Sequence, residues 1–318
     1  MIHYLYRRKK DYSRYNIVIN FCKEIQIEKD IFILLPFSKN QFIKNFSKRK
    51  KIINDFFISN YDTYVYDRKK ITKMNPRAWL KYMQDWVNFR FSYYLLSDTQ
   101  SHFDYWQSLF GKYTGKHMVL PVLADTRIYY PPEKQEKTPV VKILFYGSFI
   151  PLHGIEKILT ALDKMEKNGL KFQATLLGNG QTYSQMKALK EQLATDQVDM
   201  NGEIIDEIAL AEIIRNNDII LGIFGDSKKA RSVVPNKVYQ ATACKKCTVT
   251  MKSDALLEFY HQDDLVTCDN TSDDLAKTLE NLIENRELID LFAEKGFLRF
   301  QEIYQQKKQE FREFLEAV

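Results

Sequence analysis

Residues 225–243, GDSKKARSVVPNKVYQATA, carry the side chains best suited to bind an anion. Pro235 favours the first position of a helix, and the unpaired N–H groups of a first helical turn attract negative charge. Two cations, Arg231 and Lys237, add charge-assisted hydrogen bonds to that attraction. We therefore expect a ligand that carries a diphosphate at this point of the chain, contacted by Arg231, Val234, Pro235, Asn236, Lys237 and Gln240.

A second stretch, residues 142–160, would position this site. The apolar run Ile143 to Tyr146 predicts a buried strand that ends at Gly147, and apolar residues at helical spacing follow from Ile155 onward. A strand followed by a crossover helix is the unit of a parallel sheet, in which ligands bind beyond the carboxyl ends of the strands. The residues expected to face the ligand are Gly147, Ser148, His153, Gly154 and, after the next strand, Gly178. In the alternative interpretation these glycines only shape tight loops.

Three motifs resemble one known family. Residues 145–159 (FYGSFIPLHGIEKIL), 176–180 (LLGNG) and 216–243 are similar to the C-terminal domain of family 4 glycosyltransferases of the GT-B fold, in the group that builds bacterial capsules and O-antigens. The closing helices share the likeness, and residues 61–130 share it more loosely.

The resemblance implies an α/β fold of two doubly wound, Rossmann-like domains that face each other across a cleft. It implies a retaining, metal-independent hexosyltransferase that moves a sugar from a nucleotide-sugar donor to a lipid-linked or polysaccharide acceptor in surface glycan synthesis. Neither a metal nor a separate cofactor is expected, and the resemblance identifies no catalytic residue.

The chain departs from the family pattern at three places. The family motif has two glutamates, of which the second binds the nucleotide ribose, and Ser232 and Gln240 stand at these positions. The histidine usual after the strand expected at residues 61–66 is absent. No glycine-rich loop follows the first strand, unless residues 11–14 replace it. These departures keep two alternatives open: a non-catalytic GT-B subunit that binds a partner transferase or a glycan, and a sugar-nucleotide epimerase.

The length of 318 residues suits two domains. We expect a first domain at residues 1–128, an exposed linker rich in proline and charge at 129–139, a nucleotide-sugar domain at 140–300 and a helix at 301–318 that returns to the first domain. In the first domain the sequence predicts strands at 2–6, 31–36, 61–66 and 93–96, and helices at 14–25, 42–58 and 77–90. A helix N-cap is expected at 97–99, with His102 in its first turn.

The expected helix at 42–58 is basic and amphipathic. Such a helix can lie on an anionic membrane, or it can be a crossover helix with its lysines in water. Its cations, Lys48, Arg49, Lys50 and Lys51, are the expected contacts to a membrane or to the acceptor.

Charge is distributed unevenly along the chain. Residues 1–139 hold 25 Lys and Arg against 13 Asp and Glu, whereas the remainder holds 22 against 28. Without a zinc-finger spacing or an RNA-binding signature, the basic half fits a membrane or a phosphate-bearing acceptor better than nucleic acid.

The four dispersed cysteines favour a reducing compartment, and Cys244 and Cys247 are best explained as packing residues rather than a metal half-site. We expect a cytoplasmic protein, either free or peripheral on the inner face of the plasma membrane.

Overall fold

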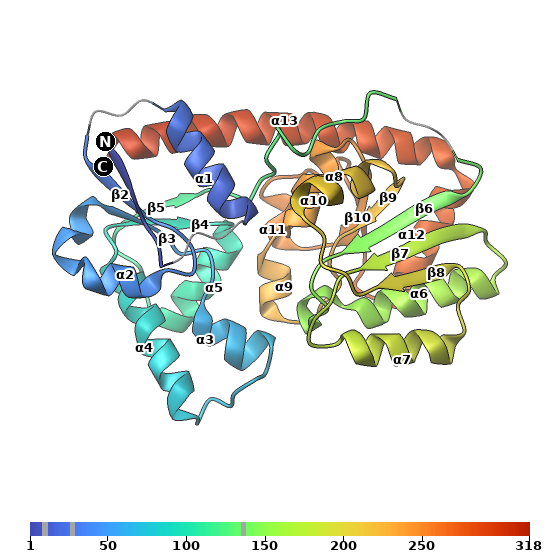
Figure 1. Cartoon of the computed structure of the whole chain (residues 1–318), viewed down its shortest axis with the longest axis horizontal. Coiled ribbons are helices and arrows are strands. Elements are labelled where there is room, and N and C mark those ends of the chain that lie inside the picture. Colours follow the sequence, from blue (N-terminus) through green and yellow to red (C-terminus); the bar gives the residue numbers. More distant parts are fainter. Residues whose placement is uncertain (8–11, 26–28, 135–137) are drawn as a thin grey trace. The chain divides into compact units, whose positions relative to one another are not determined.

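The computed structural model describes residues 1–7, 12–25, 29–134 and 138–318. The chain forms two compact units (Figure 1). The first contains Met1–Leu123, Ser232–Val234 and Tyr304–Val318, and the second contains Ala124–Arg231 and Pro235–Ile303. The N-terminal segment of the first unit ends at Leu123, five residues before the expected boundary.

The first unit is built on a parallel five-stranded sheet in the order β1-β2-β3-β4-β5. Its strands follow one another across the sheet in chain order, so this sheet has no point at which the order reverses. The elements are β1 (Ile2–Leu5), α1 (Ser13–Glu24), β2 (Ile31–Leu34), α2 (Lys39–Lys44), a 3₁₀ helix (Phe46–Lys51), β3 (Ile52–Asp55), α3 (Asn60–Asp62), a π-helical turn (Thr63–Asp67), α4 (Pro76–Phe91), β4 (Tyr94–Ser97), α5 (Gln100–Phe110) and β5 (Lys116–Val119).

Two of the predicted elements are wrong. The single helix expected at 42–58 is divided among α2, the 3₁₀ helix and β3, because Ile52 and Ile53 are fully buried and pair with β2 and β4. The strand expected at 61–66 is helical instead. The Ser59 hydroxyl caps this segment by accepting a hydrogen bond from the backbone N–H of Asp62 at 2.9 Å.

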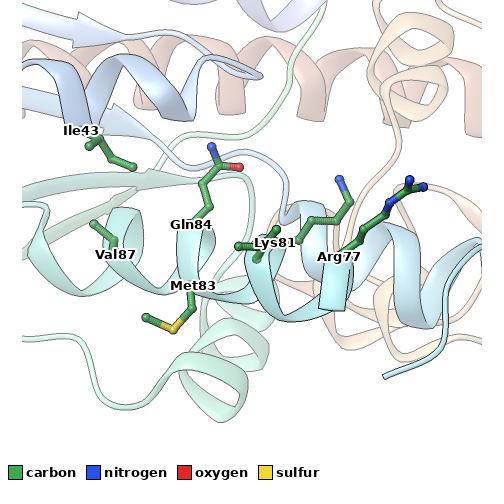
Figure 2. A pocket seen from close by; sticks show the side chains of 7 residues that line it. Ile43, Arg77, Lys81, Met83, Gln84 and Val87 are labelled. Carbon is green, nitrogen blue, oxygen red and sulfur yellow. The ribbon is translucent and has the colours of Figure 1, made fainter. Parts of the chain in front are cut away.

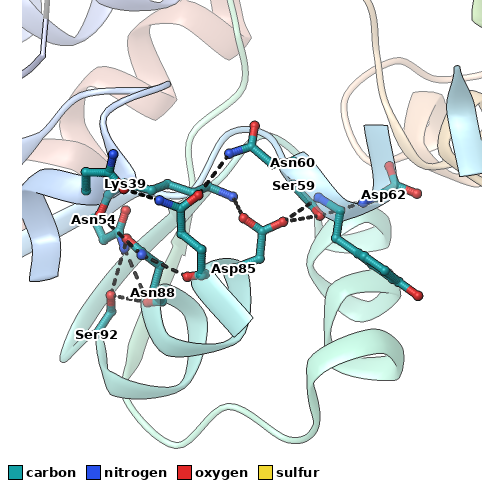
Figure 3. Close-up of polar contacts among 11 residues, drawn as sticks. Lys39, Asn54, Ser59, Asn60, Asp62, Asp85, Asn88 and Ser92 are labelled. Carbon is teal, nitrogen blue, oxygen red and sulfur yellow. Dashed lines mark hydrogen bonds and ion pairs between the residues drawn. The ribbon is translucent and has the colours of Figure 1, made fainter. Parts of the chain in front are cut away.

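A buried polar cluster fixes α4 against α2 and α3 (Figure 3). The Asp85 carboxylate accepts hydrogen bonds from the Lys39 ammonium, from the Ser59 hydroxyl at 2.7 Å and from the backbone N–H of Tyr61 at 2.8 Å. One turn further along α4, the Asn88 side-chain amide donates to the carbonyl of Lys39 at 3.3 Å. Because one carboxylate holds three groups from two segments, the position of α4 is strongly specified.

The second unit contains a parallel six-stranded sheet in the order β11-β10-β9-β6-β7-β8. The chain runs outward from β6 to β8 and then returns to the other side of β6, which gives the doubly wound order with a switch point between β6 and β9. The elements are β6 (Val141–Tyr146), a 3₁₀ turn (Pro151–His153), α6 (Ile155–Lys167), β7 (Phe172–Leu177), α7 (Tyr183–Leu193), β8 (Val198–Asn201), α8 (Glu207–Arg215), β9 (Ile219–Leu221), α9 (Lys228–Ser232), α10 (Asn236–Ala243), β10 (Cys247–Met251), α11 (Asp254–Leu257), β11 (Val266–Cys268), α12 (Ser272–Glu284) and α13 (Arg286–Glu316).

The segment expected to be an exposed linker is not exposed at its start. Tyr129 is almost completely buried within the second unit, and residues 135–137 of this segment lie outside the described residues. The last helix begins at Arg286 rather than at residue 301, and its residues from Tyr304 onward belong to the first unit. There Tyr304 and Phe311 contact the ring of Phe21 in α1. Within the described residues, no helix combines the length and apolar composition that a membrane-spanning segment requires.

Candidate functional site

Two glycine turns meet at the carboxyl ends of β6 and β7. Gly147 has a φ of +133° and Gly178 a φ of +128°, values that side chains of L-residues rarely allow. A Cβ atom on Gly178 would lie 2.2 Å from the carbonyl oxygen of Gly147, so the two turns can only pack in this way without a side chain there. The backbone N–H of Gly147 donates to the carbonyl of Leu177 at 2.9 Å. The predicted glycines therefore do shape the loops, and they also leave bare backbone beside the switch point.

The start of α6 approaches the loop after β9 equally closely. Gly154 caps α6 with a left-handed φ of +62°, and a Cβ atom there would lie 2.3 Å from the carbonyl oxygen of Phe224. The backbone N–H of Phe224 donates to the carbonyl of His153 at 3.1 Å. These contacts bring the loops that follow β6 and β9 together on the two sides of the switch point.

Lys237 is the cation of this site. It lies in the first turn of α10, only 4% of its surface is exposed, and within the described residues its ammonium has no hydrogen-bond partner. The Nζ atom lies 3.8 Å from the centroid of the Phe145 ring and 3.5 Å from the point where a Cβ atom of Gly147 would be. Burial lowers the pKa of Lys237 well below its usual value. An anion bound at Gly147 would provide the partner that this cation lacks.

The imidazole of His153 flanks the same point from the other side. Its Nδ1–H donates to the carbonyl of Ser148, and its Cε1 atom lies 3.3 Å from the position of a Cβ atom on Gly147. Burial lowers the pKa of His153 well below its usual value, and the nearby charge of Lys237 lowers it further. A neutral ring that donates from Nδ1 leaves Nε2 as an acceptor, which suits a sugar hydroxyl better than a phosphate.

Gln240, one turn further along α10, is bonded to two tyrosines. Its Oε1 atom accepts from the hydroxyl of Tyr146 at 2.8 Å, and its Nε2 atom donates to the hydroxyl of Tyr129 at 2.8 Å. All three side chains are buried. Burial also raises the pKa of Tyr146 well above its usual value, so its hydroxyl stays protonated. Neither tyrosine is among the binding residues expected from the sequence. The sequence pattern places Tyr146 at the end of the apolar strand beside the site, but it gives no indication for Tyr129.

The other expected donor-binding residues are less closely gathered. Pro235 is the N-cap of α10 rather than its first helical residue, and the first bond of the helix runs from the N–H of Val238 to the carbonyl of Pro235 at 3.0 Å. The backbone N–H groups of Asn236 and Lys237 precede that bond. Val234 is buried, Ser148 is exposed at the turn, and Arg231 is exposed on α9.

Several other residues that the sequence analysis considered are bonded or packed inside the fold. Asp11 lies outside the described residues, and Arg14 forms a buried bidentate ion pair with Asp55 at 2.9 Å. His102 is buried in the first turn of α5, where its Nδ1 atom bonds the carboxylate of Asp98 at 2.7 Å. The four cysteines are free and buried, and the Cys244 and Cys247 pair occupies the end of α10 and the start of β10.

The four basic residues 48–51 lie in or at the end of the 3₁₀ helix and do not form part of an amphipathic α-helix. Three of them lie over aromatic rings: the Nζ of Lys48 is 4.7 Å from the ring centroid of Phe32, Arg49 is 4.7 Å from that of Phe46, and the Nζ of Lys50 is 5.8 Å from that of Tyr93. They belong to the first unit, as does the surface around them.

Comparison with known proteins identifies the class of protein to which the chain belongs. The model of the family glycosyl transferases group 1 matches residues 130–299, more than half of the chain. No curated protein sequence matches. Among solved structures, the chain is similar to sucrose-phosphate synthase from Thermosynechococcus elongatus (TM-score 0.69, 13% identity, 91% of this chain and 74% of that one). HepE from Anabaena in complex with UDP is also similar (TM-score 0.65, 13% identity, 100% of both chains). So is trehalose-6-phosphate synthase from E. coli bound with UDP-2-fluoro glucose (TM-score 0.62, 13% identity, 96% of this chain and 77% of that one).

The chain therefore belongs to the glycosyl transferases group 1 and has the GT-B fold, with one parallel sheet in each unit. Its class of activity is glycosyl transfer. The matched residues include the two glycine turns, Lys237 and Gln240, so the candidate site lies within the part of the chain that defines the family.

Proposed function

We propose that the protein is a retaining, metal-independent glycosyltransferase that uses a nucleotide-sugar donor bound by the second unit. The observation that carries this proposal is the buried ammonium of Lys237, which faces the bare backbone of Gly147 and has no acceptor within the described residues. A buried cation without a partner is costly, and a bound diphosphate would remove that cost. The UDP and UDP-sugar complexes of HepE and trehalose-6-phosphate synthase support a donor of this kind.

The diphosphate would lie between Gly147 and the first turn of α10. There the N–H groups of Asn236 and Lys237 and the positive end of the helix dipole meet its charge, as does the ammonium of Lys237. Negative charge grows on the diphosphate as the glycosidic bond breaks, so these groups stabilise the transition state more than the ground state. Lys237 would thus take the role that a divalent ion has in metal-dependent transferases.

Retention follows if the acceptor attacks from the face that the diphosphate leaves. The bond between the anomeric carbon and the phosphate oxygen breaks, the acceptor oxygen forms its bond on the same face, and the acceptor proton passes to the departing phosphate oxygen. This step needs no general base from the protein. The neutral His153 would accept a hydrogen bond from a donor hydroxyl through Nε2 and orient the sugar.

For the acceptor we propose a lipid-linked saccharide or a growing polysaccharide of the bacterial surface, reached from the cytoplasmic side. The likeness of residues 145–159 and 216–243 to capsule and O-antigen enzymes supports this assignment. The four free cysteines agree with a reducing compartment.

A thermal-shift screen against UDP-, GDP-, dTDP- and ADP-sugars tests the donor. A ligand at 100 times its dissociation constant should stabilise the folded protein by about 2.7 kcal/mol. The sugar released or transferred from the binding donor should then keep its anomeric configuration in an NMR time course. An inverted product would refute retention, and stabilisation that requires added Mg²⁺ would refute metal independence.

A non-catalytic GT-B subunit is the second candidate, and the bonding of Gln240 favours it. The amide is occupied on both sides by Tyr146 and Tyr129, so a ribose would have to displace a tyrosine to reach it. If no nucleotide sugar stabilises the protein and no donor is consumed, this second candidate is preferred.

A further inference from the structure

The segment from Arg68 to Gln84 is one of two strongly basic stretches of the first unit, and residues 39–51 are the other. It holds six Lys and Arg and no Asp or Glu: Arg68, Lys69, Lys70, Lys73, Arg77 and Lys81. The segment comprises the loop before α4 and the first half of that helix. Asp85, which follows the segment, is already paired with the buried ammonium of Lys39, so it does not neutralise the exposed cations.

Large apolar side chains protrude from the same segment. Met74 is 92% exposed, Trp79 61% and Leu80 62%. A single exposed apolar residue is ordinary, but three within seven positions, among cations only, form a patch that is typical of an interaction site. Trp79 and Leu80 follow the buried Ala78, so they leave α4 on the side that faces solvent.

A groove of about 520 Å³ continues this patch along α4. In Figure 2 the cationic side chains Arg77 and Lys81 lie toward one end of the groove, and Ile43 and Val87 lie toward the other. Leu80 and Met83 add further apolar surface between them. A groove that is apolar at one end and cationic at the other matches a molecule with a hydrocarbon chain and an anionic head.

The polar cluster at Asp85 makes this surface a fixed one. Asp85 and Asn88 bond α4 to α2 and to the segment before α3 (Figure 3). The patch is therefore presented on a rigid helix, whose exposed side chains need no rearrangement to contact a partner.

We propose that the start of α4 and the loop before it bind an anionic phospholipid surface, with Trp79, Leu80 and Met74 at the level of the headgroups and acyl chains and with Lys73 and Arg77 at the phosphates. Cations interleaved with exposed Trp, Leu and Met are the composition of an interfacial helix, whereas a nucleic acid would gain nothing from the protruding methionine and leucine. This membrane contact is independent of donor binding, and it replaces residues 48–51 as the membrane side of the protein. Beside those residues the exposed ring of Tyr93, under Lys50, protrudes less (48%) than Met74, Trp79 and Leu80 do.

Vesicle co-sedimentation of the full chain tests the proposal. The wild type should bind phosphatidylglycerol-containing vesicles, should release from them at high salt, and should bind pure phosphatidylcholine far more weakly. Replacing Lys73 and Arg77 by Gln should lower the affinity about thirtyfold, because each cation near an anionic surface contributes roughly one kcal/mol. The matched control, Lys48→Gln with Lys50→Gln, removes the same charge from the other basic run and should change affinity less than threefold.

Two further measurements separate lipid insertion from simple charge attraction. Trp79→Ser with Leu80→Ser keeps every charge and should still weaken binding at least tenfold. Brominated lipids should quench the tryptophan fluorescence of the wild type but quench the Trp79→Phe variant much less. Equal binding to neutral and anionic vesicles would overturn the proposal, as would equal losses in the patch variant and the control. Because the substituted side chains are exposed, unchanged melting temperatures are expected for all variants and serve as the folding control.

Discussion

The ammonium of Lys237 lies 3.8 Å from the centroid of the Phe145 ring, with no acceptor among the described residues. The contact joins the first turn of α10 to β6, one of the two strands at the switch point of the second sheet. A cation–π contact stabilises the charged form only in part, because burial removes the ammonium from water. Three of the five predictions below concern Lys237 itself or the backbone that it faces.

Donor binding should be coupled to proton uptake. Burial lowers the pKa of Lys237 in the free protein, and a bound diphosphate would raise it again. Between those two pKa values the complex binds more protons than the free protein, so affinity should fall as pH rises through the lower one. Calorimetric titration with a nucleoside diphosphate at a series of pH values below the ordinary pKa of lysine, in buffers of different ionisation enthalpy, should report uptake of up to one proton. Lys237→Met should show none, and zero uptake by the wild type would contradict the assignment.

Gly147→Ala should weaken donor binding more than it weakens folding. A Cβ atom at this φ of +133° is strained, and it would occupy the space between His153 and Lys237 where the diphosphate is proposed to lie. We expect at least a tenfold loss of nucleotide affinity. As the matched control, Gly169→Ala also has a positive φ, but nothing lies within 4 Å of its Cβ position. Similar losses in the two variants would mean that strain, not the site, explains the effect.

Much of the second unit follows from its sequence. The run Ile143 to Tyr146 predicts β6 because an apolar strand that ends at a glycine has few other interpretations, and the helical spacing after Gly154 predicts α6. The contact between Gln240 and Tyr129 could not be predicted, because the two residues are 111 positions apart and no pattern links them. The burial of Lys237 could not be predicted either, because it depends on Phe145 and on the turn at Gly147.

In the first unit the two wrong predictions have identifiable physical causes. Apolar residues recur at helical spacing along residues 42–58, yet the segment includes the buried four-residue strand β3. Periodicity alone cannot distinguish so short a buried strand from part of a helix. Residues 61–66 alternate as a strand would, but the cap at Ser59 and the bonds to Asp85 fix a helical turn. Contacts made by distant residues therefore decide both segments.

Gln240→Ala should destabilise the second unit. It removes the acceptor of the Tyr146 hydroxyl at 2.8 Å, which leaves that hydroxyl only the carbonyl of Lys237 at 3.5 Å. An unsatisfied buried hydroxyl costs about 1–3 kcal/mol. In urea denaturation the loss should shrink when Tyr146→Phe is already present, since the two residues share one bond. Strictly additive losses would show that this bond contributes nothing.

Asp85→Ala should lower the free energy of unfolding of the first unit by about 3–5 kcal/mol, because it leaves the buried ammonium of Lys39 without its carboxylate. Asp85→Asn keeps an acceptor for Ser59 and for the N–H of Tyr61 and should cost less. Denaturant unfolding monitored by tryptophan fluorescence measures both variants. A loss below one kcal/mol for Asp85→Ala would refute the structural role of this cluster.

The affinity of the wild type and of Lys237→Met for the nucleoside diphosphate of the donor, measured side by side by calorimetry, tests the central claim most directly. Methionine has a similar length and no charge, so the variant should lose about 1.5–3 kcal/mol of binding, roughly ten- to a hundredfold in affinity. Its melting temperature should stay the same or rise, because a buried cation without a partner is removed. Unchanged affinity in a folded Lys237→Met variant would contradict the claim that this lysine and the turn at Gly147 hold the diphosphate.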